Sequence, residues 1–146
     1  LQMTGQMGDV MKESAQIALT YVRSVASDYG VKENYFEKHD IHLHIPEGAV
    51  PKDGPSAGIT MATAMLSAVT GRKVLPRVAM TGHVLMIGGL KEKLLAARMA
   101  QVEKVLVPAK NQPDVEELSK EITKGMEIVY IKEMNEVIRE AFVPEK

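Results

Sequence analysis

Short strand-like runs alternate with helix-like runs through the second half of this 146-residue chain, and this alternation constrains the fold more than any other feature. The pattern predicts strands at 77–80, 84–87, 104–107 and 126–131, and helices at 90–100, 113–122 and 132–142. Because a helix between two strands allows them to pair in parallel, the pattern predicts an α/β layer fold with a mixed, partly parallel sheet and flanking helices.

The first half adds a helix, a strand and a second helix. Apolar residues recur at helical spacing from Gly8 to about Asp28, and Gly30 supplies a stop signal. Residues 40–45 alternate strictly between polar and apolar, which is typical of a strand with one buried face. A second helix is predicted from Pro55 to about residue 69, because proline is favoured at the first helical position. With no internal repeat or linker, we expect a single compact domain.

Composition excludes several functional classes. The chain has no cysteine, which rules out disulfides, thiol nucleophiles and thiolate metal sites. Its formal net charge is −1 with both signs dispersed, unlike the basic surfaces of proteins that bind nucleic acid or anionic membranes. Its apolar stretches, such as 59–69, are too short to span a bilayer, and its first residues do not resemble a signal peptide. We therefore expect a cytoplasmic protein without membrane or nucleic-acid partners.

The segment 51–58 lies between a predicted strand and a predicted helix. If Pro55 is the first helical residue, Ser56 is the second, and its backbone N–H points outward at the positive end of the helix dipole. A hydroxyl beside such donors suits acyl transfer, which needs a nucleophile next to an oxyanion hole. In a simpler interpretation, which stays open, Ser56 only begins the less buried face of the helix. The further hydroxyl residues on that face are Thr60, Thr63, Ser67 and Thr70.

A serine nucleophile needs a base to take its proton, and the segment 88–97 offers one. On a helix, Lys93 shares a face with Leu90, Leu94 and Ala97, whereas Lys91 lies on a different face. A lysine among apolar neighbours is a candidate base, because desolvation disfavours the charged form of an amine. The alternative is that Lys93 packs its aliphatic stem and keeps its ammonium group in water.

Three further possibilities remain open. Asp40, His42 and His44 project from one face of a predicted strand, but without another ligand cluster a solvated polar face explains them better than a metal site. His83 is isolated, yet a Ser–His–Asp triad needs no fixed order of residues. The turn at Ser56 could also cradle a phosphate, as in a small-molecule kinase, or the chain could be a non-catalytic assembly domain.

Six segments in a fixed order cover essentially the whole chain. They are Gly8-Asp9-Val10-Met11-Lys12-Glu13-Ser14, His42-Leu43-His44-Ile45-Pro46-Glu47-Gly48, Pro51-Lys52-Asp53-Gly54-Pro55-Ser56-Ala57-Gly58, Val78-Ala79-Met80-Thr81-Gly82, Gly88-Gly89-Leu90-Lys91-Glu92-Lys93 and Val105-Leu106-Val107-Pro108. Together they resemble the proteolytic domain of the Lon protease family of the soluble bacterial and mitochondrial type.

This resemblance implies a serine endopeptidase with a Ser–Lys dyad, in which Ser56 is the nucleophile and Lys93 is the base. It also implies that Thr81 helps to orient the lysine amine, and that Asp53 influences active and inactive states of its loop. The family fold is α/β and resembles the second domain of ribosomal protein S5. No metal or other cofactor is implied for this domain.

The resemblance also implies partners and a context. Members of the family assemble as homo-hexameric rings and degrade unfolded or damaged proteins in protein quality control. Full-length members carry an AAA+ module that uses ATP and magnesium, and an N-terminal region that recruits substrates. We therefore expect residues 1–146 to form the proteolytic domain without those modules.

Two departures from the family pattern stand out. The family domain begins with strands that would precede Leu1. The family pattern also has several more residues between Thr81-Gly82 and the Gly88-Gly89 pair. Either those residues are deleted in this chain, or a mobile loop that holds them joins Gly82 to His83, and we expect the loop.

Overall fold

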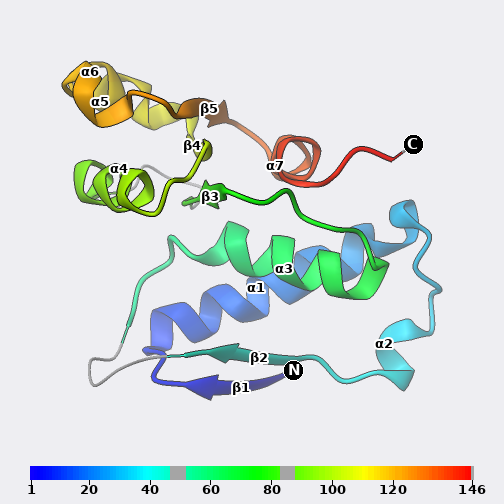
Figure 1. Ribbon diagram of the computed structural model, residues 1–146. Coiled ribbons are helices and arrows are strands. Elements are labelled where there is room, and N and C mark those ends of the chain that lie inside the picture. Colours follow the sequence, from blue (N-terminus) through cyan, green and yellow to red (C-terminus); the bar gives the residue numbers. More distant parts are fainter. Residues whose placement is uncertain (47–51, 83–87, 146) are drawn as a thin grey trace. The chain divides into compact units, whose positions relative to one another are not determined.

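The computed structural model describes residues 1–46, 52–82 and 88–145 and divides into two compact units, Leu1–Arg72 and Lys73–Lys146 (Figure 1). Both units combine parallel strands with helices, so the predicted α/β class is confirmed. Within the described ranges every strand pair is parallel, and antiparallel pairing is confined to one isolated bridge between Val74 and Phe142. The likeness to the second domain of ribosomal protein S5 stays a prediction.

Two of the sequence-based expectations concern residues outside this description. The predicted strand at 84–87 lies within 83–87, and the loop expected to join Gly82 to His83 has one of its ends at His83. Both therefore remain predictions.

The first unit pairs two short strands in parallel, with helices following each strand. In register, Gly5 at the end of β1 lies opposite Ile45 at the end of β2, so the carboxyl ends of both strands meet at one edge. Its elements are β1 (Gln2–Gly5), α1 (Asp9–Val25), η1 (Ala26–Tyr29), α2 (Tyr35–Lys38), β2 (His42–Ile45) and α3 (Gly58–Thr70). The polar–apolar alternation at 40–45 predicted β2, whereas β1 has only one half-buried residue and was not predicted.

Helix α1 forms because its apolar residues repeat along one side of the helix. Its buried apolar residues are Met11, Ala15, Ala18, Leu19 and Val22, and α1 packs against α3. The helix continues as η1 and ends at Gly30, whose left-handed backbone (φ 78°) lets its N–H donate to the Ser27 carbonyl at 3.0 Å. The stop predicted at Gly30 is confirmed.

The prediction that the second helix begins at Pro55 is wrong, because α3 begins at Gly58. The N–H of Gly58 donates to the Pro55 carbonyl at 3.1 Å, which closes a tight turn, and the helical bond from Met61 to Ala57 follows at 2.9 Å. Proline therefore opens a turn rather than the helix. Ser56 lies within this turn, immediately before α3.

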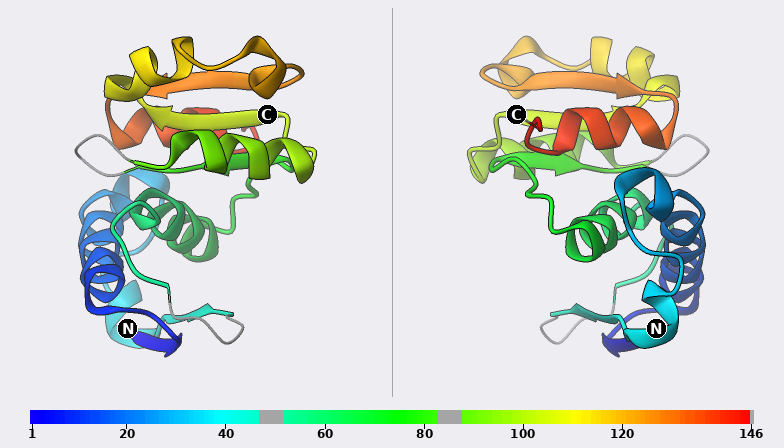
Figure 2. Two further views of the ribbon diagram at one scale, coloured as in Figure 1. Left: turned by 90° about the vertical axis from the view of Figure 1, so that its left-hand side faces the viewer. Right: turned by 90° about the vertical axis from the view of Figure 1, so that its right-hand side faces the viewer.

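The second unit is built on a three-stranded parallel sheet in the order β3-β4-β5. Its elements are β3 (Val78–Met80), α4 (Leu90–Met99), β4 (Lys104–Pro108), η2 (Ala109–Asn111), α5 (Gln112–Glu116), α6 (Lys120–Thr123), β5 (Glu127–Ile131) and α7 (Met134–Ala141). Figure 2 shows α4 and α7 on opposite faces of this sheet.

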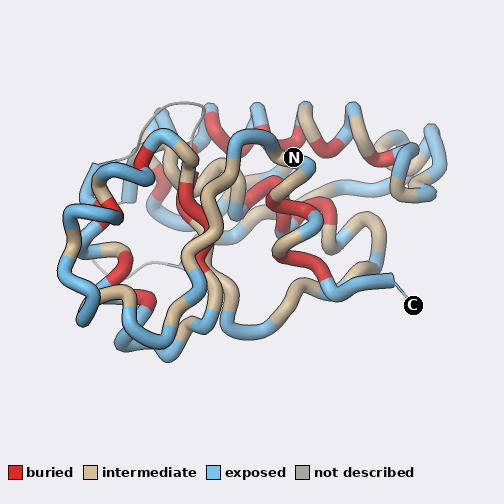
Figure 3. The backbone as a smooth tube through the Cα atoms, turned by 90° about the horizontal axis from the view of Figure 1, so that it is seen from above, coloured by how far each residue is buried: buried red, intermediate tan, exposed pale blue. Residues whose placement is uncertain are grey.

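One apolar cluster joins α4 to the sheet. Leu90, Leu94 and Ala97 on the helix share this cluster with Val105 and Val107, which alternate along one face of β4. In Figure 3, buried and exposed stretches accordingly alternate along the helices of the chain. The helix predicted at 90–100 is confirmed.

The helix predicted at 113–122 is broken in the structure. Helix α5 ends at Glu116, and Ser119 adopts an extended backbone (ψ 133°) with its hydroxyl accepting a hydrogen bond from the Glu121 N–H at 3.3 Å. Serine competes for backbone donors in this way and starts a new helix, α6. The last predicted helix is confirmed as α7, which begins with a capping box formed by Glu133 and Glu136.

The orientation of α4 is testable by comparing two leucines on the same helix. Leu94 is fully buried and Leu95 is 38% exposed. We expect Leu94→Ala to lower the free energy of unfolding by about 3 kcal/mol, because it removes buried methyl groups and leaves a cavity. We expect Leu95→Ala to change it by no more than about 0.5 kcal/mol. Urea unfolding of both variants measures the difference, and equal losses would contradict the assigned face.

Candidate active site

The segment carrying Ser56 is tied to the start of α1 by backbone contacts. Lys52 forms a parallel bridge with Met7, in which the Lys52 N–H donates to the Gln6 carbonyl at 3.0 Å. The Gly8 N–H in turn donates to the Lys52 carbonyl at 2.9 Å. These bonds hold the segment just before Ser56 beside the segment that joins β1 to α1.

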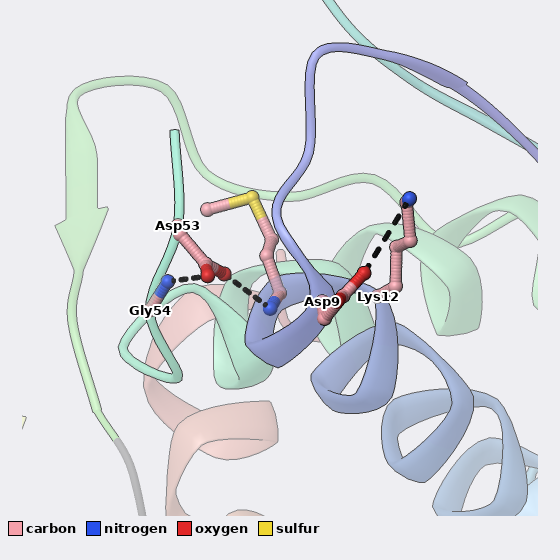
Figure 4. Close-up of polar contacts among 5 residues, drawn as sticks. Asp9, Lys12, Asp53 and Gly54 are labelled. Atoms are coloured by element: carbon pink, nitrogen blue, oxygen red, sulfur yellow. Dashed lines mark hydrogen bonds and ion pairs between the residues drawn. The ribbon is translucent and has the colours of Figure 1, made fainter. Parts of the chain in front are cut away.

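Asp53 adds a side-chain contact to the same place. Its Oδ1 accepts hydrogen bonds from the backbone N–H of Met11 at 2.8 Å and of Gly54 at 2.9 Å (Figure 4). The first N–H groups of a helix have no partner within the helix, so a carboxylate there supplies an acceptor at the positive end of the dipole. Hydrogen bonds from Met11 and then Gly54 hold the pKa of Asp53 below its usual value.

Ser56 itself is half-buried in the turn that follows Gly54, whose backbone lies in the region open to glycine (φ 126°). The simpler interpretation of Ser56, as the start of a less buried face, stays open: on that face Thr60 is exposed and Ser67 and Thr70 are half-buried, whereas Thr63 is only 2% exposed. The Thr63 hydroxyl donates to the Ile59 carbonyl at 2.7 Å, and that of Ser67 to the Arg72 carbonyl at 2.6 Å.

Lys93 belongs to the second unit and lies in the first turns of α4. It is half-buried on the face that carries the buried residues Leu90 and Leu94, whereas Lys91 and Leu95 are exposed. The predicted helical face of Lys93 is therefore confirmed. Its N–H donates to the Gly89 carbonyl at 3.2 Å, so the residue sits one turn into the helix.

Thr81 is buried directly after β3. Its N–H donates to the Leu106 carbonyl at 3.1 Å, which extends the β3–β4 pairing by one residue. Ala79 packs against the cluster beneath α4, and side chains two positions apart share one face of a strand. Thr81 therefore lies on the face of the sheet that α4 covers. Helix α4 is also the helix that carries Lys93.

A cavity of about 390 Å³ opens at the start of α4. Its lining residues are Gly88, Gly89, Leu90, Lys91, Glu92, Asp114 and Leu118. Lys93 is not one of them, so the cavity lies beside the predicted base rather than around it. The pairing of Ser56 with Lys93 stays a prediction.

The histidines of β2 contact Thr4, a residue that no sequence pattern singled out. Thr4 Oγ1 lies 2.8 Å from His42 Nε2 and 2.7 Å from His44 Nδ1, because β1 pairs with β2 in a register that places Thr4 opposite His44. A hydroxyl can donate one hydrogen bond and accept another, so one threonine serves both rings. His83, the candidate for a triad, lies outside the described residues.

Within 1–46, 52–82 and 88–145, no three His, Asp or Glu side chains gather as a metal site with three protein ligands would require. No helix in those ranges combines the length and the apolar character needed to cross a bilayer.

Known proteins resemble the chain along its whole length. The family model of the Lon protease (S16) C-terminal proteolytic domain matches residues 1–144. The Lon protease of Lachnoclostridium phytofermentans is 62% identical over 98% of this chain, and Lon protease 1 of Bacillus subtilis is 49% identical over all of it. The chain spans only 18% and 20% of the length of these two relatives.

The alignment with the Bacillus subtilis relative extends over 152 residues, although this chain has 146 and contributes all of them. That relative therefore has residues within the aligned span that this chain lacks.

The contact between Asp53 and α1 predicts a pH dependence. Because the pKa of Asp53 is lowered in the folded chain, its carboxylate contributes stability above the pKa of the unfolded state, and this contribution is lost as the pH falls through the folded value. We expect carbon-13 NMR to show the Asp53 carboxyl titrating below an ordinary aspartate. Titration at or above the ordinary value would contradict the contact.

Proposed function

Because the chain belongs to the family of Lon protease (S16) C-terminal proteolytic domains, we propose that it hydrolyses peptide bonds as a serine endopeptidase, with Ser56 as nucleophile and Lys93 as general base. The observation that carries the proposal is the family match across residues 1–144, which includes both residues. The half-buried position of Lys93 between Leu90 and Leu94, and the placement of Ser56 in a tethered turn, support these roles.

In the proposed reaction, the neutral amine of Lys93 takes the proton of Ser56 as Oγ attacks the substrate carbonyl carbon. The tetrahedral intermediate collapses when the carbon–nitrogen bond breaks, and the ammonium group of Lys93 returns the proton to the leaving amine. Water then hydrolyses the acyl-enzyme, again with Lys93 accepting a proton, and Ser56 is released. Backbone N–H groups near the start of α3 would stabilise the negative oxygen.

Thr81 is proposed as a positioning residue for the lysine. It is buried on the sheet face that α4 covers, and a hydroxyl there can accept a hydrogen bond from an amine and fix its direction. The role differs from that of Ser56 and Lys93, since Thr81 exchanges no proton with the substrate.

We extend the proposal to the longer protein of which such domains form part. Its substrates would be unfolded or damaged proteins, its assembly a homo-hexamer, and its setting protein quality control in the cytoplasm. ATP and magnesium would act in a separate ATPase module that unfolds substrates, and the proteolytic chemistry of this chain would need no cofactor. The phosphate-binding and non-catalytic alternatives are outcomes of the tests that follow.

The dyad is tested by three single substitutions in the chain. We expect Ser56→Ala and Lys93→Ala each to reduce cleavage of an unfolded peptide at least about a thousandfold, because the two groups act as one unit. Lys91→Ala is the matched control, since Lys91 is exposed on the other side of α4, and it should retain cleavage. Circular dichroism checks that all three fold. Unchanged cleavage by Ser56→Ala or Lys93→Ala would exclude the dyad, and phosphate-dependent stabilisation of a chain without peptidase activity would favour the kinase-like alternative.

Thr81 is tested by separating kcat from KM. We expect Thr81→Val, which keeps the shape but removes the hydroxyl, to lower kcat about tenfold or more with little change in KM, because a misdirected base slows only the chemical step. Thr81→Ser restores the hydroxyl and should recover most of kcat. Equal activity of the valine and serine variants would argue against the positioning role.

A further inference from the structure

The two histidine rings of β2 converge on one point on the exposed face of the β1–β2 pair. His42 Nε2 lies 2.8 Å from Thr4 Oγ1, and His44 Nδ1 lies 2.7 Å from the same oxygen. The two ring nitrogens are therefore no farther apart than these two distances combined. All three side chains are exposed, so an ion can reach them from solvent. Two imidazole nitrogens directed at one point are the arrangement that binds a transition-metal ion as a chelate.

The register of the strands explains why a different nitrogen points inward on each ring. Thr4 lies opposite His44, whereas His42 lies opposite Gln2, two positions back along β1. His44 therefore meets the hydroxyl with Nδ1, the ring nitrogen nearer its backbone, and His42 reaches it with Nε2, the farther one. Both rings project from one face of β2 because side chains alternate along a strand, and the half-buried Leu43 between them projects from the other. Pairing with β1 thus adds what the spacing of the histidines alone did not show.

The distances leave room for an ion with a small adjustment. A zinc–nitrogen bond measures about 2.0–2.1 Å, so an ion at the position of the Thr4 hydroxyl needs each ring to approach by about 0.7 Å after that hydroxyl turns aside. Exposed side chains make such rotamer changes rapidly. Within the described ranges, no third His, Asp or Glu side chain joins the pair. The two nitrogens therefore form an open chelate, in which water fills the remaining coordination positions.

The chemistry of the two donors selects the ion. Imidazole nitrogen suits zinc, copper and nickel, whereas magnesium and calcium prefer oxygen ligands. From the convergence of the rings and from their donor type, we infer that His42 and His44 chelate one divalent transition-metal ion, with Zn²⁺ or Cu²⁺ as the ions that fit best. The site takes no part in the proposed peptide hydrolysis, and the inference does not depend on the roles of Ser56 and Lys93.

The test titrates Zn²⁺ into the 146-residue chain by calorimetry in a buffer that does not bind metals. We expect His42→Asn and His44→Asn each to weaken binding at least about tenfold, because a chelate presents its second nitrogen at high effective concentration. The double variant should bind little more weakly than either single variant, since each single change already breaks the chelate. Mg²⁺ should give no binding heat. Circular dichroism checks that the variants fold.

The matched control is His39→Asn. His39 is exposed like the other two rings, but its Nδ1 lies 2.9 Å from the Tyr35 carbonyl oxygen and its ring stacks on that of Tyr35. It has no second histidine ring as a partner in these contacts. Its replacement should leave the affinity for Zn²⁺ unchanged.

A second measurement needs no variant, so a folding defect cannot obscure it. Diethylpyrocarbonate modifies histidine rings, and peptide mass mapping reports the rate at each one. At a Zn²⁺ concentration about ten times Kd, we expect modification of His42 and His44 in the wild-type chain to slow about tenfold, and that of His39 to stay unchanged.

Three results would overturn the inference. The first is a single variant, His42→Asn or His44→Asn, that binds Zn²⁺ as tightly as the wild-type chain. The second is a loss of half the bound Zn²⁺ in each single variant without a change in affinity, which would reveal two independent rings. The third is modification of His42 and His44 at the same rate with and without Zn²⁺. None of these results bears on peptide cleavage, so the proposed function is tested separately.

Discussion

Parallel strand pairing is the constraint on which the rest of this structure depends. Two parallel strands cannot be joined by a tight turn, so the chain must cross over from the end of one to the start of the next, usually through a helix. β1, α1 and β2 form one such crossover, and β3, α4 and β4 form another. As a result, both proposed reacting groups follow the carboxyl end of a parallel strand: Ser56 after β2 and Lys93 after β3.

The exposed ends of helices create a second requirement, since their first N–H groups need acceptors. At α7 the acceptors are local, because Glu133 and Glu136 form a capping box within one turn. At α1 the acceptor is Asp53, from a segment that arrives beside the helix only after β2 has paired with β1. A helix end that is satisfied by a distant loop also holds that loop in place, and this loop leads to Ser56.

The proposed base occupies a position where an apolar side chain would contribute more to stability. Lys93 lies between Leu90 and Leu94 on the face of α4 that packs against Val105 and Val107. A leucine there would add apolar burial, whereas a lysine must keep its nitrogen solvated or bonded. Local disagreement between residue type and environment of this kind is expected at functional positions, where stability is given up for chemistry.

Hydrophobic periodicity is a local property, and the sequence alone therefore determined the α/β class, the helix carrying Lys93 and the face on which that residue lies. Turns are decided by single hydrogen bonds, so the start of α3 at Gly58 rather than Pro55 emerged only from the structure. The hydrogen bond from the Met11 N–H to Asp53 also required the tertiary structure. This contact joins the segment before Ser56 to the start of α1, and the two are distant in the chain and brought together by strand pairing. The spacing of residues within one segment does not predict which other segment it will contact.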